Sequence, residues 1–205
     1  YLSLADSDQL DLRIYAMIGG AEEVLDSIGK PIKKYGNDHL DIASVKLYSD
    51  GALGSRGAAM IEPYSDDVEN RGLPFWTQQQ LDKMTIKANR MGFQVGIHAI
   101  GDLGNRMALN AFEKSQDGKP SPLRNRVEHA QIITLEDIPR FAELNAVADL
   151  SPYLWFPSPI IDSIKKALVL WPQQIEDIIE DEIYSSNMIY NDLHPLLKRY
   201  VSLYD

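Results

Sequence analysis

The sequence of 205 residues contains no cysteine, which excludes disulfide bonds and thiolate metal ligands. Any metal ion must therefore be held by nitrogen and oxygen atoms. No apolar run reaches the roughly 18 residues of a membrane-spanning helix, and no signal peptide is recognisable. We therefore expect a cytoplasmic protein without membrane partners. Because the chain starts at Tyr1 rather than at methionine, we expect a piece of a longer protein, and an upstream signal peptide would change the expected location.

Positive charge is also scarce. The chain has 20 Lys and Arg against 30 Asp and Glu, a formal net charge of −10 and a sequence pI of about 4.8. Binding to a phosphate backbone requires clustered Lys and Arg, so this balance argues against nucleic acid and against anionic membrane surfaces as partners. Hydrophobic residues make up 44%, which is typical of a soluble globular protein with one sizeable core.

Apolar segments that favour β-strands alternate with segments of helical periodicity. The expected strands are 12–18, 41–48, 94–100, 124–131 and 146–150, and the expected helices between them begin near 21, 78, 103 and 134. Such alternation predicts parallel strands joined by right-handed helical crossovers. A complete eight-stranded barrel takes about 250 residues. We therefore expect an α/β fold that is either an open sheet or part of a barrel at 1–159, followed by a helical tail at 160–205.

Capping signals help to place two of the helices. Thr77 and Gln80 form a capping-box pattern before the helix that starts at 78, and Thr134 with Asp137 suggests the same for the helix that runs to about Leu144.

The segment 49–72 is loop-like and much longer than the usual connection of about 4–6 residues, and long loops in compact domains are often functional. Arg56 in this loop could grip a substrate carbonyl or carboxylate, or it could be a solvated charge. The Asp50-Gly51 pair that opens the loop is typical of a turn. Asp102, just after the strand 94–100, could orient a ligand or a water molecule, or cap the next helix.

Three residues suited to chemistry lie at the carboxyl ends of different expected strands: Lys46, His98 and His129. Taken singly, each has an ordinary explanation: an ion-paired or snorkelling lysine, a hydrogen-bonded core histidine and an edge histidine. Strand alternation does not decide whether His129 faces a pocket. In a parallel sheet, however, these ends meet at one edge, where two neutral imidazoles suit a borderline divalent ion such as zinc. Lys46 could join them only as a neutral or carbamylated amine.

Three motifs resemble those of the amidohydrolase superfamily, in particular the branch that contains N-substituted formamide deformylase and the exoenzyme regulators. They are Val45–Arg56, Gly96–Asp102 and Arg126–Gln131, with a weaker match at Ala148–Tyr153. The resemblance covers roughly residues 10–155. It implies part of a TIM-like barrel, with a metal site at the carboxyl-end face.

The resemblance also implies roles for individual residues. Lys46 matches a lysine that is carboxylated and bridges two metals, and His98 and His129 match histidine ligands of the fifth and sixth barrel strands. Asp102 and Arg56 would be supporting groups. In such enzymes a metal activates water for attack on an amide-type carbonyl. The family's first-strand His-x-His pair and its last-strand aspartate have no counterpart here.

We therefore expect a fragment of a metal-dependent hydrolase that acts on carbon–nitrogen bonds of a small amide-type substrate. The isolated chain is expected to be inactive and to bind zinc weakly or not at all. One alternative is a degenerate, non-catalytic binding or regulatory module; another is a flavodoxin-like sheet with incidental histidines, which predicts no shared edge for them. An open sheet exposes edges and an apolar face, so we also expect a homo-oligomer or coverage by the tail helices.

Overall fold

The computed structural model describes residues 1–149, which lie in the first of two units of the chain, Tyr1–Ser151. The second unit is Pro152–Asp205. The expected helical tail at 160–205, its boundary with the barrel segment and the motif residues 151–153 lie outside the described residues. Within residues 1–149, no helix combines the length and apolar character that crossing a membrane requires.

Six strands of the described part form one sheet. They are β1 (Ile14–Gly19), β2 (Ile32–Lys34), β3 (Leu40–Tyr48), β4 (Gln94–Ala99), β5 (Arg126–His129) and β6 (Val147–Asp149). The order is β1-β3-β4-β5-β6 with every neighbouring pair parallel, which confirms the predicted α/β fold with five parallel strands.

The short strand β2 was not predicted from the sequence. It pairs antiparallel with β3 through Ile32 and Ile42. At Ile42, β1 pairs with one edge of β3. On the other edge of β3, pairing with β4 begins only at Ser44. β2 therefore covers the part of that second edge which β4 leaves free. Its two exposed lysines provide no apolar alternation that would have revealed it.

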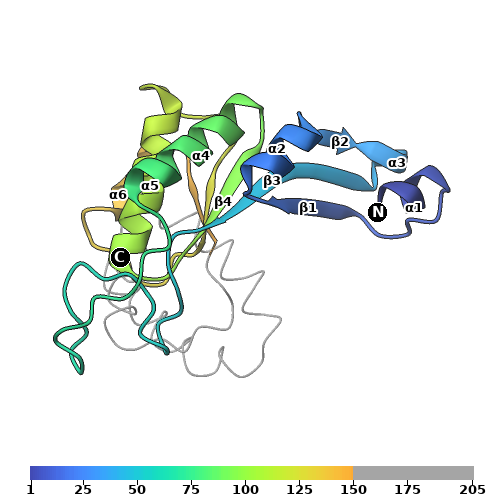
Figure 1. Cartoon of the computed structure of the whole chain (residues 1–205). Helices are drawn as coiled ribbons and strands as arrows, with labels where there is room; N and C mark the ends of the chain where they lie inside the picture. Colours follow the sequence, from blue (N-terminus) through green and yellow to red (C-terminus); the bar gives the residue numbers. More distant parts are fainter. Residues whose placement is uncertain (150–205) are drawn as a thin grey trace, which may run out of the picture. The chain divides into compact units, whose positions relative to one another are not determined.

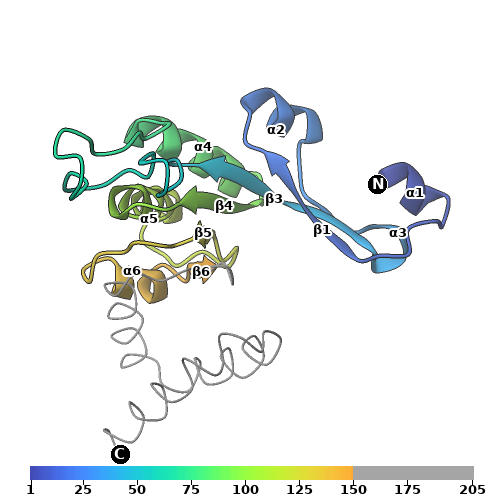
Figure 2. The same ribbon diagram turned by 90° about the horizontal axis from the view of Figure 1, so that it is seen from below.

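The helices of the described part are α1 (Leu2–Asp6), α2 (Glu22–Ile28), α3 (Tyr35–Asp38), α4 (Gln78–Arg90), α5 (Asp102–Gln116) and α6 (Ile138–Glu143). α1 was not predicted. α3 has left-handed backbone at Gly36 and Asn37, so this segment behaves as a turn, as the Gly-Asn-Asp sequence at 36–38 indicates. α4 and α5 lie side by side next to β3 and β4 (Figures 1 and 2).

The core lies between these two helices and one face of the sheet. Its members include Val45 and Leu47 of β3, Val95 and Ile97 of β4, Val127 of β5, Leu81 and Met84 of α4, and Leu109 and Phe112 of α5. Successive side chains of a strand point to opposite faces. Burying this set against the helices therefore places Lys46, Tyr48 and His98 on the opposite face.

The capping predictions had opposite outcomes. The Thr77–Gln80 capping box at the start of α4 is confirmed, with the Thr77 amide donating to Gln80 Oε1 at 2.9 Å. The prediction that Thr134 caps the next helix was wrong, because α6 begins only at Ile138 and the preceding residues form a turn. The Asp137 carboxylate accepts a hydrogen bond from the Thr134 hydroxyl at 2.8 Å and forms ion pairs with Arg106 at 2.8 Å and Arg140 at 2.9 Å.

The ion-paired carboxylate of Asp137 should make a contribution to stability that is lost in acid. Burial alone would raise the pKa of this carboxyl, but hydrogen bonds from Arg140, Arg106 and Thr134 outweigh burial and lower it. The pKa of Asp137 is lower in the folded protein than in the unfolded chain, where it is about 3.9. The stabilisation by the ionised carboxylate is therefore fully present above about pH 3.9 and is lost as the pH falls through the folded pKa. We expect Asp137→Asn to reduce the free energy of unfolding by about 1.5–3 kcal/mol at neutral pH.

Urea denaturation of wild type and Asp137→Asn at neutral pH and at a pH well below about 3.9 measures this contribution. The difference between the two proteins should shrink in acid. If the difference in stability does not change with pH, the charge of Asp137 does not stabilise the fold through its ion pairs with Arg106 and Arg140.

Candidate metal centre

The open face of the sheet carries polar side chains brought into line by the strand register. Lys46 pairs with Gly96, and Tyr48 pairs with His98. His98 in turn pairs with Glu128 of β5. Residues paired across neighbouring strands project to the same side, so these side chains share the face that α4 and α5 leave uncovered.

The two predicted histidines meet ring to ring. The ring centroids of His98 and His129 are 4.7 Å apart, with the ring planes at 75°. The register pairs His129 with Ala99, whose buried side chain belongs to the core face, so regular alternation would have turned His129 away from His98. Instead, the backbone is left-handed at His129 (φ 76°) and at Ala130 (φ 40°). This departure from strand geometry ends β5 and brings the imidazole to His98.

Lys46 lies on the same face, and the ring of Tyr48 lies between Lys46 and His98. Its Nζ is 5.1 Å from the centroid of the Tyr48 ring, which is 5.4 Å from the centroid of the His98 ring. Burial lowers the pKa of Lys46, with Glu128 opposing this effect and Arg126 adding to it. A lowered pKa favours the neutral amine that metal binding or carbamylation requires.

The carboxylates near Lys46 are bound to a different cation. Arg126 forms ion pairs with Glu128 at 2.7 Å and with Asp149 at 3.0 Å. A Cβ at Gly96 would lie 2.7 Å from Glu128 Oε1, so glycine at this position leaves space for Glu128 beside β4. Among the described residues Lys46 itself has no ion-pair partner within 4.0 Å.

His98 carries an unsatisfied nitrogen. Its Nε2 is buried and has no hydrogen-bond partner in the described part of the chain, unlike that of a hydrogen-bonded core histidine. Burial lowers the pKa of His98, and nearby His129 lowers it further, while Asp50 opposes the shift. A lowered pKa favours the neutral ring, and a neutral imidazole is the form that binds metal.

The two predicted supporting residues make structural contacts. Asp102 begins α5, where its Oδ1 accepts hydrogen bonds from the amides of Ile61 and Leu103, both at 2.8 Å. Arg56 forms an ion pair with Asp66 at 2.8 Å, and both side chains are about half exposed or more (47% and 63%). The surface ion pair fits the ordinary explanation for Arg56. The capping explanation for Asp102 was wrong, because the N-cap of α5 is Gly101 and Asp102 is the first helical residue. A role of either residue in substrate binding or catalysis stays a prediction.

Asp50 is a site residue that sequence reasoning missed by interpreting it as a simple turn. It is fully buried. Its Oδ2 accepts from the amides of Ala59 and Gly101, both at 2.8 Å, and its Oδ1 accepts from Ile100 at 3.0 Å. Two of these donors lie about fifty positions further along the chain, so no local pattern could reveal the contact. Asp50 thereby ties the loop after β3 to the end of β4.

The donor set suits a divalent ion but is incomplete. Within residues 1–149, no three His, Cys, Asp or Glu side chains lie close enough to hold a metal ion. His98 and His129 supply two nitrogen ligands of the type that zinc accepts. A carbamylated Lys46 is the further ligand that the resemblance to the family implies.

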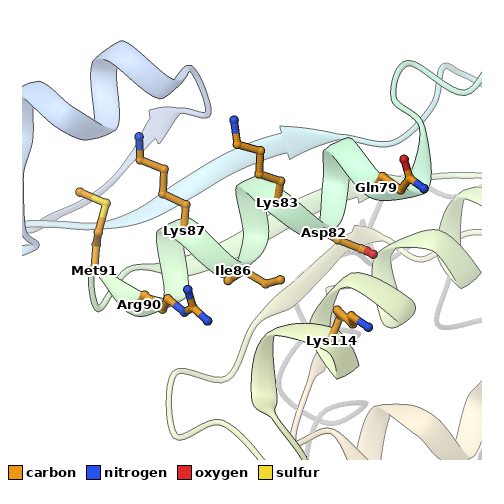
Figure 3. A pocket seen from close by; sticks show the side chains of 8 residues that line it. All are labelled: Gln79, Asp82, Lys83, Ile86, Lys87, Arg90, Met91 and Lys114. Carbon is orange, nitrogen blue, oxygen red and sulfur yellow. The ribbon is translucent and has the colours of Figure 1, made fainter.

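The described residues line two hollows. A cavity of about 500 Å³ adjoins Lys46 and is lined by Met17, Gly19, Gly20, Leu47, Tyr48 and Trp76. The other, about 610 Å³, lies on α4 and includes Lys114 of α5 (Figure 3). Two of its lysines, Lys83 and Lys87, already pair with Glu22 of α2, and none of the predicted site residues lines it.

The chain is similar to a solved structure described as an uncharacterized metal-dependent hydrolase from Pyrococcus horikoshii OT3. The TM-score is 0.64 at 34% identity, and the match covers 74% of this chain and 30% of that one. The fold is thus part of a barrel of the metal-dependent hydrolase class. Residues 1–174 match the amidohydrolase family, and the chain belongs to that family.

Two curated relatives extend the comparison. The chain is 35% identical to YtcJ of Bacillus subtilis (strain 168) over 124 residues, which are 60% of this chain and 23% of YtcJ. It is 28% identical over 145 residues to the exoenzymes regulatory protein AepA of Pectobacterium carotovorum, covering 67% of this chain and 30% of AepA. The chain thus spans less than a third of these relatives. The predicted family resemblance is confirmed, while the branch with N-substituted formamide deformylase stays a prediction.

Proposed function

We propose that this chain carries the central part of the active site of a metal-dependent hydrolase that cleaves carbon–nitrogen bonds in small amide-type substrates. The observation that carries this proposal is the meeting of two imidazoles, His98 and His129, at 4.7 Å at the carboxyl ends of β4 and β5. Lys46, with its lowered pKa, lies on the same face. Membership of the amidohydrolase family supports the assignment of this edge as the reacting centre.

Each residue has a role that its chemistry allows. His98 and His129 would hold a divalent ion such as zinc through neutral nitrogens. Lys46 would add carbon dioxide as a neutral amine and lose a proton, and the carbamate oxygens would add to the ligand set. The ion would supply a Lewis acid that activates water for attack on the carbonyl. The cavity beside Lys46, with Tyr48 and Trp76 in its wall, would receive the substrate.

A second candidate is a binding or regulatory module that has lost catalysis. One observation favours it: the described residues contain no group of three His, Cys, Asp or Glu that could hold a metal ion. In this case the cavity beside Lys46 would bind a small molecule without converting it. The two candidates differ in whether His98 and His129 would hold a metal ion.

Zinc titration of the full 205-residue chain, followed by calorimetry and by NMR of the histidine rings, distinguishes them. We expect weak binding that shifts the ring signals of both His98 and His129. Replacing either residue with alanine should reduce the affinity by more than the 10–100-fold effect typical of outer-sphere partners. His39→Ala, in the turn before β3, is the matched control and should leave the titration unchanged. Tight binding that survives His98→Ala, or ring signals that zinc leaves unmoved, would refute the metal centre.

A further inference from the structure

The hollow beside Lys46 is built mainly from apolar and aromatic side chains. Its volume of about 500 Å³ lies within the range of small-molecule sites, which is about 300–1,000 Å³. Tyr48 and Trp76 supply two aromatic rings, and Met17 supplies a thioether. Among the described residues that line the hollow, only Lys46 is charged. The composition of this wall therefore indicates which chemical group the hollow would accept.

We propose that this hollow binds a flat aromatic substituent of the substrate, and that Tyr48 and Trp76 are the residues that select it. The inference rests on the proposed function, because it narrows the amide-type substrate to one that carries an aromatic ring. The Tyr48 ring borders the hollow and also lies 5.4 Å from the ring of His98, centroid to centroid. A substituent held against Tyr48 would therefore bring the rest of the substrate to the reacting edge of the sheet.

Both aromatic residues are available for binding and held in place. Tyr48 is the last residue of β3 and leaves 48% of its surface exposed. Trp76 packs partly against the core, and both of its neighbours are fixed. The amide of Phe75 donates to the carbonyl of Ser49 at 2.8 Å, and Thr77 forms the capping box of α4. Because the Trp76 backbone is held on both sides, little conformational freedom is lost when a ligand binds.

The β1 side of the hollow has room for a ligand. Gly19 ends β1 and pairs with Lys46 in the strand register. Apart from its chain neighbours, no atom of the described residues lies within 4 Å of a Cβ added at Gly19. The Met17 side chain extends over β4, where an added Cβ at Gly96 would lie 2.5 Å from Met17 Cε. An unbranched thioether of this kind adapts to the shape of a bound ring.

An aromatic ring gains more from this wall than a saturated ring of the same size. Offset-stacked and edge-to-face contacts between rings stabilise a complex beyond the area that is buried, by an amount that corresponds to about 2–10-fold in affinity. The sulfur of Met17 adds a favourable contact with a ring edge. A cationic substituent is disfavoured, since the single charge on the wall is the amine of Lys46.

Two neutral probes, added to the full 205-residue chain without metal, test this inference. One is N-benzylacetamide; the other is N-(cyclohexylmethyl)acetamide, whose six-membered ring is saturated. Carbon-13 NMR of the Met17 methyl group, assigned with Met17→Leu, follows both titrations. We expect the benzyl probe to bind about 2–10-fold more tightly than the saturated probe. Its ring current should also shift the Met17 methyl signal, an effect that the saturated probe lacks.

Variants assign the preference to the two rings. Trp76→Leu and Tyr48→Leu each remove one ring and should lower the preference for the benzyl probe, whereas Tyr48→Phe keeps the ring and should retain it. Phe75→Leu is the matched control, because Phe75 is the aromatic neighbour of Trp76, is 53% exposed and does not line the hollow. It should leave both affinities unchanged.

The outcomes separate this inference from the proposed function. The inference is overturned if the benzyl probe does not bind, if it binds no better than the saturated probe, or if Phe75→Leu lowers the preference as much as Trp76→Leu. Neither probe needs a metal ion, so the zinc titration tests the metal centre independently. An aromatic preference without zinc binding at His98 and His129 would support the hollow and refute the metal centre. The comparison in wild type needs no variant, so the test stands even if Trp76→Leu does not fold.

Discussion

Replacing Phe112 with alanine is expected to lower the free energy of unfolding by about 3–5 kcal/mol, the cost of removing a buried aromatic side chain and leaving a cavity. Phe112 is fully buried on α5 and belongs to the core cluster between that helix, α4 and the sheet. α5 begins directly after the end of β4, so looser packing here should also disturb the position of His98. Urea denaturation near pH 7 measures the loss of stability.

Phe75 provides a control of the same residue type, because 53% of its surface is exposed. Phe75→Ala should change the free energy of unfolding by no more than about 0.5 kcal/mol. Similar small effects for both substitutions would show that the helix layer of the described unit is not packed against the sheet as the core cluster indicates.

Replacing Gly72 with alanine is expected to cost about 2–5 kcal/mol, since it combines left-handed backbone strain of about 1–2 kcal/mol with overpacking of about 1–3 kcal/mol. Gly72 has φ +80°, and an added Cβ would overlap the carbonyl oxygen of Ala58. An added Cβ at Gly101 would likewise overlap the carbonyl oxygen of Ala59. Close packing of glycines against this alanine pair therefore holds the long loop beside Asp50.

Two other glycines separate these contributions in the same urea experiment. Gly118 has φ +78° but no atom within 4 Å of an added Cβ, so Gly118→Ala should show the strain alone. Gly54 has neither feature, and Gly54→Ala should be close to neutral. If Gly72→Ala costs no more than Gly118→Ala, the close approach to Ala58 does not contribute.

Local patterns predicted the strands that bear the site. Gln94–Ala99 alternates apolar and small or polar residues with a period of two, and such a pattern leads to one register when one face is buried. The alternation of strands with helices predicted parallel pairing, which brings the ends of β3, β4 and β5 to one edge. The shared edge of Lys46, His98 and His129 follows from these two regularities.

Other features depended on contacts between distant parts of the chain. β2 pairs with the part of the β3 edge that β4 leaves unpaired, and Asp137, the N-cap of α6, binds Arg106 of the distant α5. A prediction based on propensity within a short window contains neither β4 nor Arg106.

By itself the sequence determined where the five parallel strands and the helices α4 and α5 lie, which face of the sheet is apolar and which three side chains stand at its carboxyl edge. Burial imposes short periodicities on these segments that can be read locally. Only the tertiary structure decided that His129 turns toward His98, through a left-handed residue at the end of β5. It also decided that Asp50 is a buried acceptor, because the amides from Ile100 and Gly101 reach it only after β3 and β4 have paired.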